Sequence, residues 1–321
     1  MRERAAVWCA PDPAPLGREE TGTKVPNPTG TMARSGHTRP KTGRRARRGS
    51  GRVGTVTSSE VWDEETAARY DDASAERSTP EVLDPTVDLL ARLAGDGPAL
   101  ELAIGTGRVG IPLLRRGVPV TGIELSAPMV AQLRRKVDEA TLPVAVGDMA
   151  TTRVDGEFTL VYLVWNSISN LRTQDEQVAC FQNAARHLAP GGRFVIELWV
   201  PPLRRLPPGQ LAAPFDVSDG HLGFDTFDLV SQACTSHHYT REPDGSVHHG
   251  AGSFRYIWPS ECDLMARLAG LELEQRVADW DGSPFTSDSE GHVSVWRKPL
   301  SATRKVIHSG RPDSRPDDHV A

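Results

Sequence analysis

The chain has 321 residues and a net charge of −5, with 38% apolar and 25% charged side chains, a composition typical of one or two globular domains. Residues 1–55 carry a net charge of +8, so residues 56–321 carry −13. This negative charge argues against binding of residues 56–321 to nucleic acid. The four cysteines form no C-x-x-C pair, which predicts neither a metal site nor a disulfide framework and fits a cytoplasmic protein. No apolar run reaches the roughly 18 residues of a membrane-spanning helix.

The first 55 residues are rich in Pro, Gly, Thr and Arg and lack apolar periodicity, which predicts a disordered basic tail. Three explanations of this tail stay open: its cluster "KTGRRARRGSGR" binds RNA, DNA or an acidic surface, the tail is a solvated segment of the native protein, or it is an artefact of the gene start. "VTSSEVWDEETAARYDD" from Val56 reads like a natural beginning, because Ser58 and Ser59 can cap a helix there.

From Pro80 onward, helical and strand-like patterns alternate along the chain. Apolar residues at helical spacing predict helices over 80–94, 108–117, 127–140 and 173–190. Short apolar runs predict strands over 99–104, 119–125, 143–148, 158–165 and 192–200. This alternation predicts a parallel sheet with helices on both faces.

Prolines break the pattern after Trp199. Strand-like runs over 224–242 and 245–258 flank a Pro-Asp-Gly turn and predict an antiparallel hairpin inserted into the sheet domain. A helix over 259–270 follows, with Leu264, Leu268 and Leu271 expected on its apolar face. Two strands, over 271–280 and 292–298, then close the sheet, and residues 299–321 are expected to form a loose tail.

A Gly-x-Gly-x-x-Gly turn over 105–110 directly follows the first predicted strand. Such glycines allow a tight turn and a close approach of the backbone to a ligand. Glu124, nineteen residues after Gly105, ends the second strand, where a carboxylate can accept hydrogen bonds from ribose hydroxyls. Glu101 lies inside the first strand, and its charge suits a cationic ligand better than a pyrophosphate. The turn therefore favours S-adenosylmethionine over NAD.

Several motifs in order extend this argument: "LELAIGTGRVG", "GIELSAPMV", "VGDMA", "VWNSISNL" and "LAPGGRFVIEL". On these motifs the chain from about residue 61 to 298 resembles the class I S-adenosylmethionine-dependent methyltransferases that act on small molecules. The resemblance implies an α/β, Rossmann-like, doubly wound fold. Its seven-stranded sheet is expected to be mostly parallel, with an antiparallel β insertion after the fifth strand. The expected sheet domain comprises 56–200 and 259–298, and 201–258 forms a substrate cap.

The resemblance implies S-adenosyl-L-methionine as the cofactor and no metal. Asp148 and Met149 stand where the family holds the adenine, and Ala103 replaces a glycine found in many members, for which we expect only a slight adjustment of backbone distance. The implied cofactor-binding residues are Glu101, Ala103, Gly105, Thr106, Gly107, Glu124, Leu125, Asp148, Met149, Val164 and Trp165.

Methyl transfer is an in-line displacement, for which orientation alone can supply on the order of 7 kcal/mol. Tyr70, in a segment that resembles the family's cofactor lids, and His237 or His238, in the insertion, are the candidate catalytic residues. For each of them the alternative is simple packing. The candidate acceptor-binding residues are Asn166, Tyr239, Arg255, Tyr256 and Trp258.

The predicted reaction is methyl transfer to a nitrogen or oxygen of a small molecule by a monomer or homodimer. Two other classes stay open at this point: an NAD-dependent oxidoreductase and a protein that binds S-adenosylmethionine without catalysis. A nucleic-acid adenine or cytosine methyltransferase would show an Asn/Asp-Pro-Pro-aromatic stretch after the fourth strand, where this chain has "WNSISN". A protein-arginine methyltransferase would show paired acids in the loop after that strand, and none are seen here.

Overall fold

The computed structural model describes residues 62–300. The basic tail expected over 1–55, the candidate caps Ser58 and Ser59, and all but two residues of the expected C-terminal tail lie outside these residues. Helix α1 (Glu64–Ala73) begins after Asp63, whose carboxylate accepts a hydrogen bond from the N–H of Thr66 at 2.8 Å.

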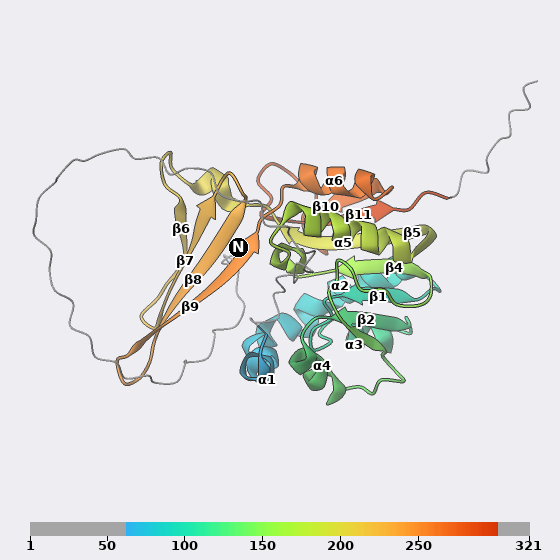
Figure 1. Cartoon of the computed structure of the whole chain (residues 1–321), viewed down its shortest axis with the longest axis horizontal. Coiled ribbons are helices and arrows are strands. Elements are labelled where there is room, and N and C mark those ends of the chain that lie inside the picture. Colours follow the sequence, from blue (N-terminus) through green and yellow to red (C-terminus); the bar gives the residue numbers. More distant parts are fainter. Residues whose placement is uncertain (1–61, 301–321) are drawn as a thin grey trace, which may run out of the picture.

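A seven-stranded sheet forms the body of the molecule, in the order β10-β11-β5-β4-β1-β2-β3 (Figure 1). Its strands are β1 (Ala99–Leu102), β2 (Val120–Glu124), β3 (Val144–Val146), β4 (Phe158–Leu163), β5 (Leu188–Trp199), β10 (Glu272–Val277) and β11 (Gly291–Arg297). The pairings among β1 to β5 are parallel, whereas β11 pairs antiparallel with both β5 and β10. The predicted α/β fold with a mostly parallel seven-stranded sheet is confirmed.

Helices cover the two faces of this sheet. They are α2 (Pro80–Ala94), α3 (Gly110–Arg115), α4 (Ala127–Arg134), α5 (Gln174–His187) and α6 (Pro259–Leu268). One apolar cluster packs α5 and α6 against the sheet, and a second packs α2, α3 and the end of α4. The ligand-binding edge of such a sheet is the carboxyl end of its parallel strands, so the loops after β1, β2 and β4 position the site.

The structure shortens the predicted helices over 108–117 and 173–190 to α3 and α5, and α4 and α6 differ from the sequence-based prediction in further ways. Helix α4 ends at Arg134, because the segment predicted to continue it forms a turn in which Asp138 accepts a hydrogen bond from the N–H of Thr141. Leu264 and Leu268 of α6 are 57% and 67% exposed, so the prediction was wrong for these two residues, whereas Leu271, just after the helix, is buried as predicted. Within the helix, Cys262, Met265 and Ala266 form the buried face instead.

The insertion after β5 is a four-stranded antiparallel sheet that stands beside the main sheet (Figure 1). Its strands are β6 (Ala212–Val217), β7 (His221–Asp228), β8 (Ala233–Arg241) and β9 (Val247–Arg255). The run 224–242, predicted as a single arm of a hairpin, contains a turn in which Asp228 accepts hydrogen bonds from the Val230 N–H and the Ser231 hydroxyl. We call these four strands the cap sheet.

Within residues 62–300, no helix combines the length and the apolar character needed to cross a membrane.

Candidate active site

The glycine-rich turn and Glu124 form one preorganised unit at the edge of the main sheet. Gly105 and Gly107 have φ angles of 59° and 84°, in the left-handed region that glycine adopts without strain. Glu124 is 6% exposed, and its two carboxylate oxygens accept hydrogen bonds from the N–H groups of Gly105 at 2.8 Å and Ser126 at 2.9 Å. Burial raises the pKa of Glu124, although the backbone bonds oppose this shift. Each oxygen keeps a further lone pair for a ligand hydroxyl.

Glu101 lies inside the molecule beneath this turn. It is 2% exposed, and its Oε2 accepts a hydrogen bond from the hydroxyl of Tyr162 at 2.8 Å. The two residues are register partners in β1 and β4. Burial raises the pKa of Glu101 to about 8, so a cation beside it would favour the ionised form.

Gly110 packs against the same carboxyl group. A Cβ at Gly110 would lie 2.7 Å from Oε2 of Glu101 and 3.0 Å from Cδ1 of Ile104. The last glycine of the motif therefore leaves room for Glu101 rather than for a ligand.

Ala103 connects β1 to the glycine-rich turn with a φ of 56°. The sequence argument considered only its size, but an L-residue with a side chain is strained in this conformation by about 1 kcal/mol. Alanine in place of glycine at position 103 thus adds backbone strain, in addition to the expected small change in backbone distance.

Asp148 and Met149 follow β3 on the same edge. Oδ1 of Asp148 accepts a hydrogen bond from the N–H of Ala150 at 2.6 Å, and Met149 is 8% exposed. The carbonyl of Met149 accepts a hydrogen bond from Nδ2 of Asn183 on α5 at 2.9 Å. The loop that is expected to hold adenine is therefore anchored to a helix of the core.

Trp165 and Asn166 form a strained turn after β4. Their φ angles are 56° and 58°, a conformation that is uncommon for non-glycine residues and recurs at functional sites. The N–H of Trp165 donates to Oε2 of Glu197 at 2.9 Å, and Oδ1 of Asn166 accepts from the N–H of Trp199 at 3.0 Å. These bonds hold the backbone of the turn, and the centroid of the Trp165 ring lies 5.6 Å from that of Trp199.

Two arginines lie against the Trp165 ring. The guanidinium carbon of Arg77, in the 3-10 helix η2 (Ala75–Ser78), is 4.2 Å from the ring centroid, and that of Arg108, in the glycine-rich turn, is 5.5 Å away. Cation–π contacts at these distances stabilise such an arrangement by about 0.5–2 kcal/mol. Motif spacing did not indicate either arginine as a site residue.

Tyr70 projects from α1 toward this group of residues. Burial raises the pKa of Tyr70, while the charges of Arg108 and Arg77 oppose the shift. The ring of Trp62 meets that of Tyr70 edge to face at 5.4 Å. A tyrosine with a raised pKa stays protonated at neutral pH, so its hydroxyl can position an acceptor as a hydrogen-bonding group.

The candidate histidines lie on opposite faces of β8. His237 stacks on Phe224 at 4.9 Å, and its Nδ1 is 3.3 Å from Nε2 of the exposed His249. Burial, followed by the charge of His249, lowers the pKa of His237. His238 is 6% exposed, and its Nδ1 lies 3.0 Å from Nε2 of His221. Because neighbouring residues of a strand alternate between faces, only one of the two can serve a given acceptor.

The face of β8 that carries His238 also carries Cys234, near the end of β5. On that face Phe227 and Cys234 form a small core with Tyr256, and Trp199, Leu203 and Leu206 pack against it. Tyr239 lies on the other face, stacked on His249 at 4.5 Å. Trp258 precedes α6 and is 37% exposed. The structure thus brings Tyr256 toward the edge of the main sheet and places Tyr239 away from it.

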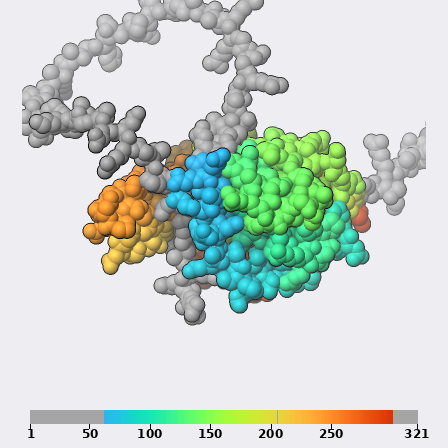
Figure 2. Space-filling model, turned by 90° about the horizontal axis from the view of Figure 1, so that it is seen from below, coloured from blue at the N-terminus to red at the C-terminus, as the bar shows by residue number. Residues whose placement is uncertain are grey.

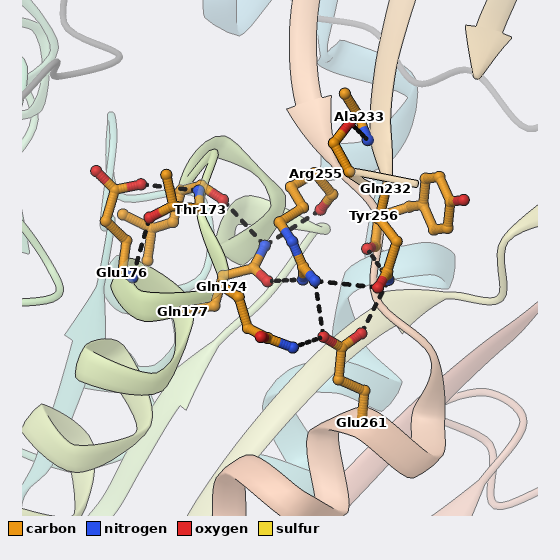
Figure 3. Close-up of polar contacts among 11 residues, drawn as sticks. Thr173, Gln174, Glu176, Gln177, Gln232, Ala233, Arg255, Tyr256 and Glu261 are labelled. Atoms are coloured by element: carbon orange, nitrogen blue, oxygen red, sulfur yellow. Dashed lines mark hydrogen bonds and ion pairs between the residues drawn. The ribbon is translucent and has the colours of Figure 1, made fainter. Parts of the chain in front are cut away.

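Arg255 is buried where the cap sheet joins the main domain (Figure 3). Its guanidinium donates to Gln177 Oε1, to Gln232 Oε1 at 3.1 Å and to Glu261 Oε1 at 2.8 Å. Gln174 also donates to Glu261. These protein contacts give Arg255 a structural role and leave it a weaker candidate for binding an acceptor than the sequence indicated.

Ser169 was not indicated by the sequence. It lies in the 3-10 helix η3 (Ser167–Asn170) directly after Asn166, and its hydroxyl is buried without a hydrogen-bond partner among residues 62–300. A buried hydroxyl without a partner is a ligand-contact candidate that only the structure can reveal.

Comparisons with known proteins agree with this geometry. The family model described as a methyltransferase domain matches residues 99–192, which include the glycine-rich turn, Glu124 and Asp148. A dTDP-3-amino-3,6-dideoxy-alpha-D-glucopyranose N,N-dimethyltransferase from Streptomyces fradiae is 36% identical over 185 residues, or 54% of this chain and 70% of that protein.

Two further proteins are similar over most of their length. A cypemycin N-terminal methyltransferase from a Streptomyces species is 25% identical over 253 residues, or 73% of this chain and 96% of that protein. The structure of the CcbJ methyltransferase from Streptomyces caelestis superimposes with a TM-score of 0.61 and 34% identity, over 67% of this chain and 89% of that one.

Proposed function

The chain belongs to the class I S-adenosylmethionine-dependent methyltransferases, and on that premise we propose that it methylates an amino nitrogen of a small molecule. The cofactor, when bound, supplies a methyl group already activated by a positive sulfur. The carbon–sulfur bond breaks as the nitrogen–carbon bond forms, the electron pair of the broken bond stays on sulfur, and the amine gives up one proton.

The residues of the cleft fit this cofactor. A Cβ at Gly105 would meet nothing closer than the Met129 methyl group at 3.5 Å, so the backbone of the turn is open to a ligand. We assign Glu124 to the ribose hydroxyls, Asp148 to the adenine amino group, and Glu101 to the cationic methionine portion. A buried carboxyl group beside a cation in a medium of low dielectric interacts far more strongly than it would in water.

The amine acceptor is supported by the relatives. The two curated relatives described above are named as methyltransferases of an amino sugar and of a peptide N-terminus. An amine becomes nucleophilic once it loses a proton, so its site needs a proton acceptor of near-neutral pKa and accurate orientation. His238, on the face of β8 opposite to His237, suits the first role, because a ring nitrogen of a neutral imidazole can accept a proton. Tyr70, Asn166 and Ser169 suit the second.

The remaining parts of the proposal concern the assembly and the domains. The sheet domain over 56–200 and 259–298 binds the cofactor, and the insertion over 201–258 covers the acceptor. The enzyme acts in the cytoplasm as a monomer or homodimer without nucleic acid. The three cysteines among residues 62–300 are buried and free, in agreement with a reducing compartment.

The test compares two amine acceptors, each with a control compound that lacks the free amine. The purified protein is incubated with methyl-labelled S-adenosylmethionine and either a dTDP-linked 3-amino sugar or a peptide with a free N-terminus. The corresponding 3-hydroxy sugar and the N-acetylated peptide serve as controls. We expect label in an amine and in neither control, read by mass spectrometry of the product. Label in the hydroxyl sugar with both amines untouched would overturn the assignment to nitrogen.

A further inference from the structure

One carboxylate joins helix α1 to the glycine-rich turn and to the segment after α4. Asp71, in the last turn of α1, accepts a hydrogen bond from Oγ1 of Thr106 at 2.6 Å and pairs with Nζ of Lys136 at 2.6 Å. Thr106 is the second residue of the glycine-rich turn, and Lys136 follows α4. The two contacts span 35 and 65 positions of the sequence, so they tie a segment from the start of the described chain to the cofactor-binding edge.

Helix α1 packs beside the glycine-rich turn and α4. Oγ of Ser126, which caps α4, donates to the carbonyl of Trp62 at 2.7 Å, so the segment before α1 is also attached to the cleft. The charge of Arg108, in the glycine-rich turn, lowers the pKa of Tyr70, and the charge of Glu124, at the end of β2, raises it. Figure 2 shows the blue residues of α1 adjoining the green residues of α4 in one continuous surface. A cofactor seated on Gly105 would thus lie beneath α1.

We propose that Asp71 is a positioning residue, the latch that holds α1 closed over the cofactor and is released when the cofactor exchanges. The inference rests on the proposed function, since it takes S-adenosylmethionine as the ligand beneath α1. Both contacts of Asp71 join protein to protein. They therefore oppose opening in the ligand-free and in the loaded protein alike.

The exposure of the latch suits repeated opening. The side chains of Asp71 and Lys136 are 48% and 35% exposed, so water and salt compete with the ion pair. Thr106, by contrast, is 1% exposed, and its hydroxyl has Asp71 as its acceptor. The buried hydroxyl gives the closed state its geometry, and the exposed ion pair makes that state sensitive to salt.

The experiment measures the exchange rates of S-adenosylhomocysteine by stopped-flow tryptophan fluorescence, which Trp62 and Trp165 beside the cleft make sensitive to binding. In Asp71→Ala we expect both the association and the dissociation rate constant to rise at least about threefold, because one charge-assisted hydrogen bond and one ion pair are lost. The dissociation constant should change by less than about twofold, since the two effects cancel. Lys136→Met should show a smaller rise that vanishes at high salt.

The control is Glu65→Gln, which removes another carboxylate of α1 from an exposed pair with Arg69 and should leave both rates as in the wild type. If Asp71→Ala does not fold, Asp71→Asn keeps an acceptor for Thr106 and must accelerate exchange at low salt. If only the dissociation rate constant rises in Asp71→Ala, and binding weakens, Asp71 is a ligand contact and the latch is overturned. Wild-type rates in Asp71→Ala would also overturn the latch. So would an equal rise of both rates in Glu65→Gln. A wild-type protein that does not bind S-adenosylhomocysteine would overturn the proposed function and the latch together.

Discussion

At the scale of single residues, Glu101 shows how burial and ligand charge interact. The carboxyl group is enclosed between β1 and β4 and shares a hydrogen bond with Tyr162. Burial raises the pKa of Tyr162 well above its ordinary value, so this residue remains a hydroxyl donor. With a pKa of about 8, Glu101 is largely protonated at pH 7 in the ligand-free protein and becomes a useful partner for a cation only after it loses its proton.

This protonation predicts the pH dependence of cofactor binding. A bound cation favours the ionised carboxyl group and lowers its pKa, so binding releases a proton below pH 8. Affinity for S-adenosylmethionine should therefore rise as the pH increases from 6 to 8, by up to about tenfold per unit. Calorimetric titrations with S-adenosylmethionine from pH 6 to pH 8 measure this change in affinity. Glu101→Gln should bind more weakly at pH 8 and lose most of the slope. If affinity rises with pH as steeply in Glu101→Gln as in the wild type, the proton released on binding comes from a group other than Glu101.

At the scale of elements, the cap sheet is held by a cluster we call the junction, formed by Gln177, Gln232, Arg255 and Glu261 (Figure 3). Arg255 ends β9, Gln232 precedes β8, and the other two lie on α5 and α6. Burial alone would raise the pKa of Glu261, but hydrogen bonds from Gln232, Arg255 and Gln174 outweigh it and hold this pKa below its usual value. The contribution of Glu261 to stability is thus present at neutral pH and is lost on acidification.

Glu261→Gln should lower the free energy of unfolding by about 1–3 kcal/mol, because it leaves the buried guanidinium of Arg255 without its counter-charge. Urea unfolding at pH 7 measures the change. The matched control is Glu274→Gln, in a more exposed pair with Arg193, where we expect less than about 1 kcal/mol. Equal losses in the two variants would argue against a special role for the junction.

At the scale of the whole molecule, local motifs and long-range contacts differed in how well the sequence revealed them. The glycine-rich turn, Glu124 and Asp148 could be predicted, because parallel strands bring their carboxyl ends to one edge whatever the details of packing. The contacts of Asp71 with Thr106 and of Arg255 with Gln177 could not, since they depend on how distant elements pack. The prediction for α6 was right for Leu271 but wrong for Leu264 and Leu268, because the helix buries the face with Cys262, Met265 and Ala266 instead.

The central claim is that the backbone at Gly105 receives S-adenosylmethionine, and calorimetric titration with S-adenosylhomocysteine tests it most directly. Gly105→Val places a side chain where the ligand must approach. Gly95→Val, at the end of α2, has the same φ of 59° and open space around it, so it shares the backbone strain away from the cleft. We predict binding by the wild type and by folded Gly95→Val and none by folded Gly105→Val, with no binding of NADH by any of them. Wild-type affinity in Gly105→Val, or binding of NADH but not of S-adenosylhomocysteine by the wild type, would contradict the account.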